Sequence, residues 1–218
     1  MINLAIYGGG DFLIEIINYL DDFSKSSKKK INILGIIDPK KIKNLNIEKI
    51  YKKKIQIFSE FPKKLNNKNT HALITFGNPE IREKCRIEVK KMGLKLFKLI
   101  HPLSKVSNPS IVGDGCIISP FSFIGPETVL EENILITIFS SVGHQSTVGK
   151  SSVISPYAKL IGKSRCGKVS FVGANSTIVG AKAKLGNYSK LVAGSVLYEN
   201  TDNNCVVSGN PAKVKYRL

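Results

Sequence analysis

The chain has 218 residues, of which 42% are apolar and 22% are charged. This size and composition are ordinary for a globular protein, disfavour whole-chain disorder and a small disulfide scaffold, and predict one or two domains with sizeable cores. No apolar run approaches the roughly 20 residues that cross a bilayer, and Met1 leads into a strand-like segment instead of a cleavable signal. We therefore expect a soluble, cytoplasmic protein without membrane insertion.

Basic residues outnumber acidic ones by 33 to 16, which gives a formal net charge of +17. Such an excess is typical of proteins that bind nucleic acid or an anionic membrane. Both halves share it, however, with +11 over residues 1–104 and +6 over residues 105–218, and no aromatic residues interleave the lysine runs at 28–30 and 52–54. We favour a solvated lysine surface that attracts anionic metabolites over nucleic-acid binding.

Residues 1–104 alternate strand-like and helical segments. Strand-like runs at 4–7, 33–37 and 72–76 are followed by a glycine turn and an apolar-periodic helix at 12–20, by Asp38-Pro39, and by Gly77 with a charged helix at 80–92. This order predicts a small parallel sheet of the α/β class, in which ligands bind where the strands end. The strand ends carry the candidate ligand groups Gly8, Gly9, Gly10, Asp38 and Gly77.

The second half contains a six-residue repeat. With 42% apolar residues in the chain, twelve apolar sites in succession at this spacing have a chance probability of roughly 10⁻⁵, so the pattern is a true repeat. The apolar sites are Val112, Ile118, Ile124, Leu130, Ile136, Val142, Val148, Ile154, Leu160, Cys166, Val172 and Ile178. The sites two residues earlier are small, except Ile134: Ser110, Cys116, Ser122, Thr128, Ser140, Ser146, Ser152, Ala158, Ser164, Ser170 and Ser176.

The repeat slips by one residue near its end. It is expected to resume at Val179, Leu185, Leu191 and Leu197, with Thr177, Ala183, Ser189 and Ser195 as the small partners. One large and one small inward site every six residues fit a short strand followed by a corner, and three such units make an 18-residue coil that stacks at about 4.8 Å. Residues 106–200 predict about five coils, in a triangular prism whose interior is filled by side chains, so a ligand must bind outside it.

His144 follows the inward Val142 by two places, in a column of corner or outward residues. Gly162 lies 18 residues further on, which is one coil, so the glycine should stack directly over the histidine. An imidazole beside a peptide N–H that no side chain covers offers a proton acceptor and an oxyanion donor, the two groups that acyl transfer from a thioester requires. The alternative is a surface histidine without a role.

Metal and redox sites are not expected. Cys85, Cys116, Cys166 and Cys205 have no CxxC spacing, and reduced, mostly buried thiols are the default. A zinc site of three histidines is disfavoured because only one histidine lies on the prism. His101, before Pro102, is expected to be a hinge between the halves, and His71 a strand-edge residue.

Several motifs in order resemble one family of enzymes. Val-Gly, Ile-Gly or Leu-Gly opens many units of the repeat, and the chain ends near Gly209-Asn210-Pro211-Ala212-Lys213, as in the left-handed β-helix hexapeptide-repeat acyltransferases. Five further motifs indicate one family within this group. They are Ile6-Tyr7-Gly8-Gly9-Gly10, Gly35-Ile36-Ile37-Asp38, Phe76-Gly77-Asn78 with Arg82, Ile100-His101-Pro102 and Ser141-Val142-Gly143-His144. Over nearly its whole length the chain resembles the sialic-acid O-acetyltransferase-like family of sugar acetyltransferases.

The resemblance implies a fold and an activity. Residues 1–104 would form a Rossmann-like domain that binds a sugar nucleotide, and residues 105–218 a left-handed β-helix acyltransferase domain with a C-terminal tail. The implied activity is acetyl-CoA-dependent N-acetylation of an amino group on a nucleotide-linked sugar in surface-glycan biosynthesis, in a homotrimer. O-acetylation of a sugar such as sialic acid, and a non-catalytic sugar-nucleotide-binding module, remain the alternatives.

The resemblance also implies residue roles on the prism. His144 would be the general base, the amide of Gly162 would face the acetyl thioester, and Gln145 stands where the family often has Asp or Glu. A glutamine can orient the ring but cannot stabilise the imidazolium with a charge. Acetyl-CoA would lie between adjacent prisms, near Gly173 and Ala174, and Lys213 would meet a phosphate or simply be solvated.

In the first half, Gly8-Gly9-Gly10 would lie near the diphosphate and Asp38 near the base or ribose of the sugar nucleotide. The alternative is a structural glycine turn. The chain departs from the family at Asp11-Phe12, where relatives often have Gly-His. An aspartate that faces a diphosphate would repel it, which bears on the identity of the ligand.

Overall fold

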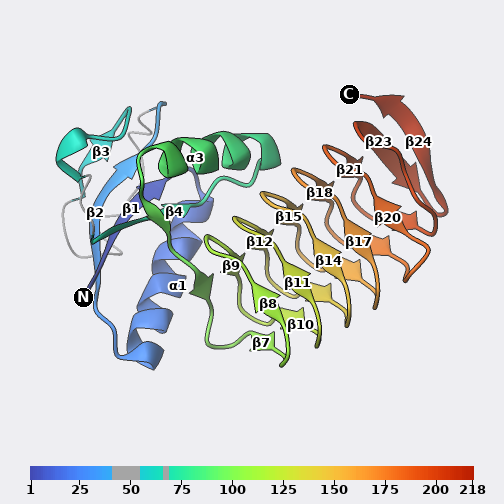
Figure 1. The fold of residues 1–218 in the computed structure, drawn as a ribbon, viewed down its shortest axis with the longest axis horizontal. Coiled ribbons are helices and arrows are strands. Elements are labelled where there is room, and N and C mark those ends of the chain that lie inside the picture. The colour runs from blue at the N-terminus through green and yellow to red at the C-terminus, as the bar shows by residue number, and fades with distance from the viewer. Residues whose placement is uncertain (41–54, 66–68) are drawn as a thin grey trace.

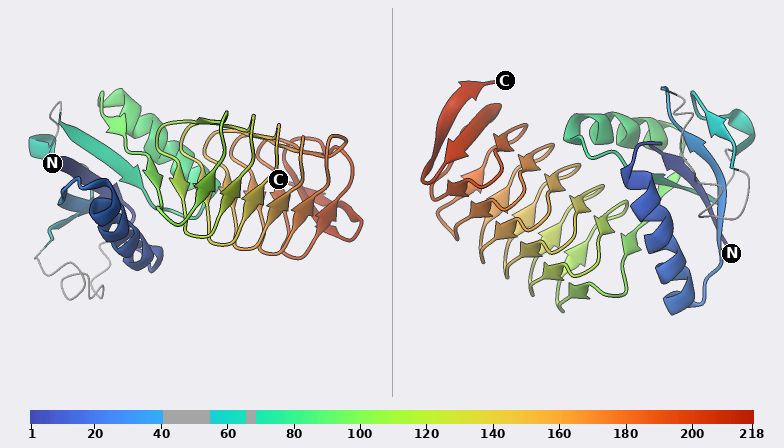
Figure 2. Two further views of the ribbon diagram at one scale, coloured as in Figure 1. Left: turned by 90° about the horizontal axis from the view of Figure 1, so that it is seen from below. Right: turned by 180° about the vertical axis from the view of Figure 1, so that it is seen from behind.

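The computed structural model describes residues 1–40, 55–65 and 69–218. A sheet with helices is followed by a long stack of short strands (Figure 1), and Figure 2 shows the same two parts from below and from behind. The lysine run at 52–54 lies outside the described residues. The predicted α/β part followed by a β-helix is confirmed.

The N-terminal sheet is parallel and has the order β3-β2-β1-β4-β5. Its strands are β1 (Ile2–Tyr7), β2 (Ile31–Ile37), β3 (Ile57–Phe58), β4 (Thr70–Ile74) and β5 (Lys95–Leu96). The helix α1 (Phe12–Ser27) follows β1, the helix α3 (Pro79–Lys91) follows β4, and a short 3-10 helix, η1 (Lys63–Leu65), precedes β4. The chain order reverses between β1 and β4, and this is the point at which open α/β sheets bind ligands.

The two faces of β1 explain why both helices pack on this sheet. Leu4 and Ile6 pack in one buried cluster with the apolar face of α1, whereas Ala5 and Tyr7 pack in another with Val89 of α3. Successive side chains of a strand point to opposite faces, so a continuous apolar run requires cover on both sides. Neither helix of the described residues is both long and apolar enough to span a membrane.

The stack of short strands forms the three faces of a prism. One sheet has six strands, β7 (Lys105–Val106), β10 (Phe123–Ile124), β13 (Ser141–Val142), β16 (Lys159–Leu160), β19 (Thr177–Ile178) and β22 (Val196–Leu197). The second has five strands, β8 (Ile111–Val112), β11 (Val129–Leu130), β14 (Thr147–Val148), β17 (Arg165–Cys166) and β20 (Lys184–Leu185).

The third face is an eight-stranded sheet. It contains β6 (Leu99–Ile100), β9 (Ile117–Ile118), β12 (Leu135–Ile136), β15 (Val153–Ile154), β18 (Phe171–Val172), β21 (Lys190–Leu191), β23 (Cys205–Gly209) and β24 (Ala212–Arg217). The last two strands form an antiparallel hairpin at the C-terminal end of the stack. Because β6 already pairs with β9, the stack begins at Leu99; the division of the chain at residue 104 stays a prediction.

The repeat fills the prism as expected. The apolar sites from Ile118 to Ile178 are buried in one cluster. The small inward residues also form hydrogen bonds, because several of their hydroxyls donate to a backbone carbonyl 15 residues further on. Ser140 donates to Ser155 O at 2.8 Å, and Ser152 donates to Gly167 O at 2.7 Å. A larger side chain would leave those buried carbonyls without this partner.

The expected position of the slip is wrong. Ile178 is the inward residue of its coil, with 0% exposure, and the next inward residue is Leu185, whereas Val179 is only half-buried. Ser176, not Thr177, is the buried small partner. The extra residue lies between the strands, since Leu160 pairs with Ile178 at a spacing of 18 but Cys166 pairs with Leu185 at a spacing of 19. A corner accommodates an inserted residue more easily than a strand, because it does not carry the ladder hydrogen bonds.

Candidate functional site

His144 lies at the prism edge between the six-stranded and five-stranded faces. It follows β13 and is exposed to solvent, as the sequence predicts. The next coil is in register with it, since Val142 pairs with Leu160 and the Lys163 N–H donates to His144 O at 2.7 Å. Gly162 is therefore the residue stacked on His144.

The ring of His144 occupies the space where a side chain of Gly162 would be. A Cβ at Gly162 would overlap Nε2 of His144 and would lie within 2.7 Å of its Cδ2 and Cε1. The φ of Gly162 lies outside the left-handed region, so the backbone conformation does not require glycine there. The lack of a side chain at this position makes room for the imidazole.

The Gly162 N–H donates no hydrogen bond within the described part of the chain. Gly143 leaves space beside it, because a Cβ at Gly143 would lie 2.6 Å from Gly162 N. An exposed imidazole and a free amide thus come from neighbouring coils. This arrangement can accept a proton and stabilise a developing oxyanion on a molecule bound at the edge.

Gln145 is turned toward the preceding coil. Its backbone is left-handed, with φ 56, and its Nε2 donates to Glu127 Oε2 at 2.8 Å. The sequence reasoning missed Glu127. The 18-residue rule that pairs His144 with Gly162 also pairs Gln145 with Glu127, so the same spacing could have found it.

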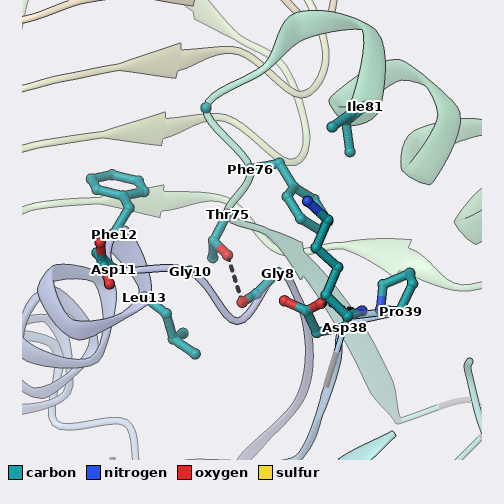
Figure 3. A pocket seen from close by; sticks show the side chains of 12 residues that line it. Gly8, Gly10, Asp11, Phe12, Leu13, Asp38, Pro39, Thr75, Phe76 and Ile81 are labelled. Carbon is teal, nitrogen blue, oxygen red and sulfur yellow. Dashed lines mark hydrogen bonds between the residues drawn. The ribbon is translucent and has the colours of Figure 1, made fainter. Parts of the chain in front are cut away.

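A cavity of about 400 Å³ opens where β1, β2 and β4 end (Figure 3). Of the five predicted ligand residues, Gly8, Gly10, Asp38 and Gly77 line it and Gly9 does not. The remaining lining residues are Asp11, Phe12, Leu13, Pro39, Lys40, Thr75, Phe76 and Ile81. The Thr75 hydroxyl lies within hydrogen-bond distance of the carbonyl oxygens of Tyr7, at 3.0 Å, and Gly8, at 3.1 Å, and so ties β4 to the end of β1.

Asp38 holds the glycine turn in place. It is 3% exposed, its Oδ2 accepts a hydrogen bond from Gly9 N at 2.7 Å, and its Oδ1 accepts one from Lys40 N at 2.8 Å. A Cβ at Gly9 would come within 2.8 Å of Oδ2. Both carboxylate oxygens thus already have backbone partners, and this geometry favours the structural interpretation of the turn while leaving Asp38 on the cavity wall.

The cavity and His144 lie on different sides of the prism. A second cavity of about 280 Å³ shares Phe12 and Gly77 with the first and is bounded by Leu135, Val153 and Phe171, which belong to the eight-stranded face. His144 lies on the edge opposite that face, between the other two sheets. One copy of the chain therefore does not bring the two predicted sites together.

The predicted acetyl-CoA contacts lie elsewhere on the prism. Gly173 and Ala174 follow β18, at the edge between the eight-stranded and six-stranded faces, and Gly173 N and Ala174 O are used in hydrogen bonds between coils. Lys213 is exposed on β24. Lys213 pairs with Ser208, which the strand register places in the column of Gly173, so these two predicted contacts lie toward the same edge, whereas His144 lies at a different edge of the same chain.

The other histidines are structural. His101 is 2% exposed, its Nε2 lies 3.1 Å from Asp22 Oδ2, and its Nδ1 accepts from Leu103 N at 3.1 Å. It fixes the start of the prism to α1, in agreement with its expected place at the junction. The ring of His71 packs edge-on against Phe97.

All four cysteines are free thiols, and Cys116, Cys166 and Cys205 are buried. Burial raises the pKa of Cys166 to about 12 and that of Cys116 to about 11, so these thiols are poor nucleophiles at neutral pH. Among the described residues, no group of three or more His, Cys, Asp or Glu side chains could hold a metal ion.

Neither a family model nor a curated protein matches this chain. Solved structures do match it over nearly its full length. The acetyltransferase domain of PglB from Neisseria gonorrhoeae FA1090 superposes with a TM-score of 0.83 at 22% identity, covering 97% of this chain and 98% of that one. WeeI from Acinetobacter baumannii AYE superposes with a TM-score of 0.81 at 18% identity, covering 98% and 100%.

PerB from Caulobacter crescentus, solved in complex with CoA and GDP-perosamine, has a TM-score of 0.83 at 19% identity and covers 98% of this chain and 97% of that chain. At such identities the likeness establishes the fold. This chain is therefore an α/β sheet domain followed by a left-handed parallel β-helix, a fold that it shares from end to end with these proteins.

Proposed function

We propose that the protein is an acetyl-CoA-dependent N-acetyltransferase that acts on the amino group of a nucleotide-linked sugar. The observation that carries the proposal is the exposed imidazole of His144 packed over Gly162. The solved structures add support, because the matched domain of PglB is an acetyltransferase domain and PerB binds CoA together with GDP-perosamine, a nucleotide-linked amino sugar. Within that group, the motifs favour the sialic-acid O-acetyltransferase-like family.

His144 would remove the proton as the sugar nitrogen attacks the thioester carbonyl. The C–N bond forms first and gives a tetrahedral oxyanion, which the Gly162 N–H would stabilise. The C–S bond then breaks, and the proton held by His144 can pass to the leaving thiolate. Gln145 would help to orient the ring. Its bond to Glu127 anchors the glutamine side chain.

The cavity at the strand ends would hold the sugar nucleotide, with Gly8, Gly10 and Gly77 on its walls and Gly9 fixed by Asp38. The exposed Asp11 would disfavour close approach of a diphosphate, so the amide groups at the start of α1 would have to offset it. Gly173, Ala174 and Lys213 are the proposed contacts of acetyl-CoA.

The separation of these sites within one chain supports a shared site in a homotrimer. Three prisms side by side would bring an edge of one copy to an edge of the next, and acetyl-CoA would lie between them. The protein would act in the cytoplasm, in surface-glycan biosynthesis.

A mass-spectrometric screen tests the function directly. Purified protein is incubated with acetyl-CoA and with UDP-, GDP- and dTDP-linked amino sugars, and a gain of one acetyl group is measured. We expect His144→Ala to lower the rate by about 10²–10⁴-fold, whereas Lys105→Ala, an exposed residue of the first coil, leaves it unchanged. Transfer by the His144→Ala variant at the original rate would refute the mechanism.

The same screen separates the alternatives. Acetylation of sialic acid or of a sugar hydroxyl, without reaction at an amino group, would favour O-acetylation. Binding of a sugar nucleotide without any acetyl transfer would favour a module in which the β-helix serves only assembly.

A further inference from the structure

A buried arginine joins the two parts of the molecule. Arg82, on α3, is 0% exposed and reaches Asn133, which lies 51 residues further along the chain at a prism corner between β11 and β12. The chemistry proposed above uses neither residue.

Arg82 uses all five of its N–H donors. Nε and Nη2 donate to Asn133 O at 3.0 and 2.8 Å, and Nη2 donates also to Asn133 Oδ1 at 2.9 Å. Nη1 donates to Ile74 O at 2.8 Å and to Phe76 O at 3.1 Å. None of these partners is a carboxylate, and burial lowers the pKa of Arg82 to about 10. A charge in such a place is costly, and only the planar, five-donor guanidinium can satisfy this set of carbonyls.

Asn133 completes the connection from the prism side. Its Nδ2 donates to Arg82 O at 3.0 Å and to Ser151 Oγ at 2.9 Å. Ser151, one coil further on, donates to Glu83 Oε2 at 2.6 Å. Two successive coils of the prism are thus bonded to two successive residues of α3.

Arg82 also bonds to the wall of the cavity described above. Ile74 O and Phe76 O lie at the end of β4, where Thr75, Phe76 and Gly77 line the cavity. The guanidinium therefore binds the cavity wall and the prism corner at once. Any rotation of one part against the other would break several of its hydrogen bonds.

We infer that Arg82 and Asn133 form a positioning pair, which holds the sugar-nucleotide cavity at a fixed place relative to the prism edges where acetyl transfer occurs. This inference rests on the proposed function. Both residues would act through geometry, because neither touches the reacting atoms. A displacement of about 1 Å between bound reactants can lower a rate by about 10²-fold.

Asn133→Gly is the sharpest variant. Asn133 has a left-handed backbone, with φ 60, which glycine adopts without strain, so the substitution removes only the side-chain bonds. Asn204→Gly is the matched control, since Asn204 also has a left-handed φ of 56 but is exposed at the other end of the prism. Asn133→Asp keeps the acceptor for Nη2 and serves as the conservative variant, including the case in which the glycine variant does not fold.

We expect Asn133→Gly to lower kcat/KM for the sugar nucleotide by about 10- to 100-fold per folded protein. Asn133→Asp keeps the acceptor for Nη2 but lacks the two Nδ2 donor bonds, so it should recover only part of the loss. The Kd values of the nucleoside diphosphate and of acetyl-CoA, each measured alone, should stay within about twofold, because each part keeps its own site. An unchanged kcat/KM, or a loss matched by weaker binding of the nucleoside diphosphate, would overturn the inference.

Hydrogen exchange keeps this test separate from the proposed function. In Asn133→Gly, but not in Asn204→Gly, amides of residues 83–91 of α3 should exchange faster, because the helix loses the part of its bonding to the prism that the Asn133 side chain supplies. Equal exchange in the two variants would overturn the positioning pair. Faster exchange in a protein that transfers no acetyl group would instead support the pair and refute the proposed function.

Discussion

Gly162→Ala separates the chemistry of the site from the stability of the fold. The added methyl group would overlap the His144 ring at Nε2 and lie within 2.7 Å of Cδ2 and Cε1, so the ring must turn away from the Gly162 amide. The backbone of Gly162 lies outside the left-handed region, and alanine is tolerated there. Gly→Ala at a compatible site stabilises by about 0.4–1 kcal/mol through the unfolded state.

The expected effects on activity and stability therefore have different sizes. Because the exposed ring can rotate into solvent, we expect the free energy of unfolding to change by less than about 1 kcal/mol. Loss of a positioned base raises the activation barrier by about 3–5 kcal/mol, which is about 10²–10⁴-fold in rate. Acetyl transfer and urea unfolding of the same preparations measure the two quantities.

A double-mutant cycle with His144→Ala tests whether the clash with the imidazole ring is what lowers the activity of Gly162→Ala. Once the ring is removed, the methyl group added by Gly162→Ala has nothing to clash with, and this second substitution should leave the residual rate unchanged. Full activity in Gly162→Ala would refute the packing argument. So would a further large loss of rate in the His144→Ala background, because the methyl group would then be acting on something other than the ring.

Three further predictions concern the prism and its contacts. Gln145→Glu should not raise activity, because it places a second carboxylate beside Glu127, which Gln145 contacts at 2.8 Å. Adding Glu127→Gln should relieve the repulsion between the two carboxylates. The acetylation rates of the single and double variants measure the effect of that repulsion. Glu83→Gln should destabilise the protein by about 1 kcal/mol at pH 7. Burial raises the pKa of Glu83, but hydrogen bonds from Arg86 and Ser151 outweigh this effect and hold that pKa below its ordinary value. The stabilisation is therefore present above the unfolded pKa and lost as pH falls through the folded pKa. Urea unfolding at pH 7 and pH 3 should show that the difference in stability between wild type and variant shrinks at the lower pH. Ile154→Ala, at a core site with 0% exposure, should cost about 2–5 kcal/mol in the same assay.

Much of the prism follows from sequence periodicity alone. The six-residue pattern identifies the inward residues, the coil length of 18 and the stacking of Gly162 on His144, because each coil buries the same positions and its strands bond only to the coils above and below. The parallel sheet of the first half follows from its alternation of strands and helices. Exposure of His144 follows from its place two residues after an inward site.

The tertiary structure decided the contacts between distant residues. The slip lies in a corner after Ile178 because insertion within a strand would break the ladder. Asp38 binds the Gly9 amide within the sheet part, and Arg82 reaches Asn133 through hydrogen bonds that depend on how the sheet part and the prism meet. A repeat specifies its own stacking locally, whereas the seam between the parts depends on side-chain directions and buried hydrogen bonds that no period in the sequence encodes.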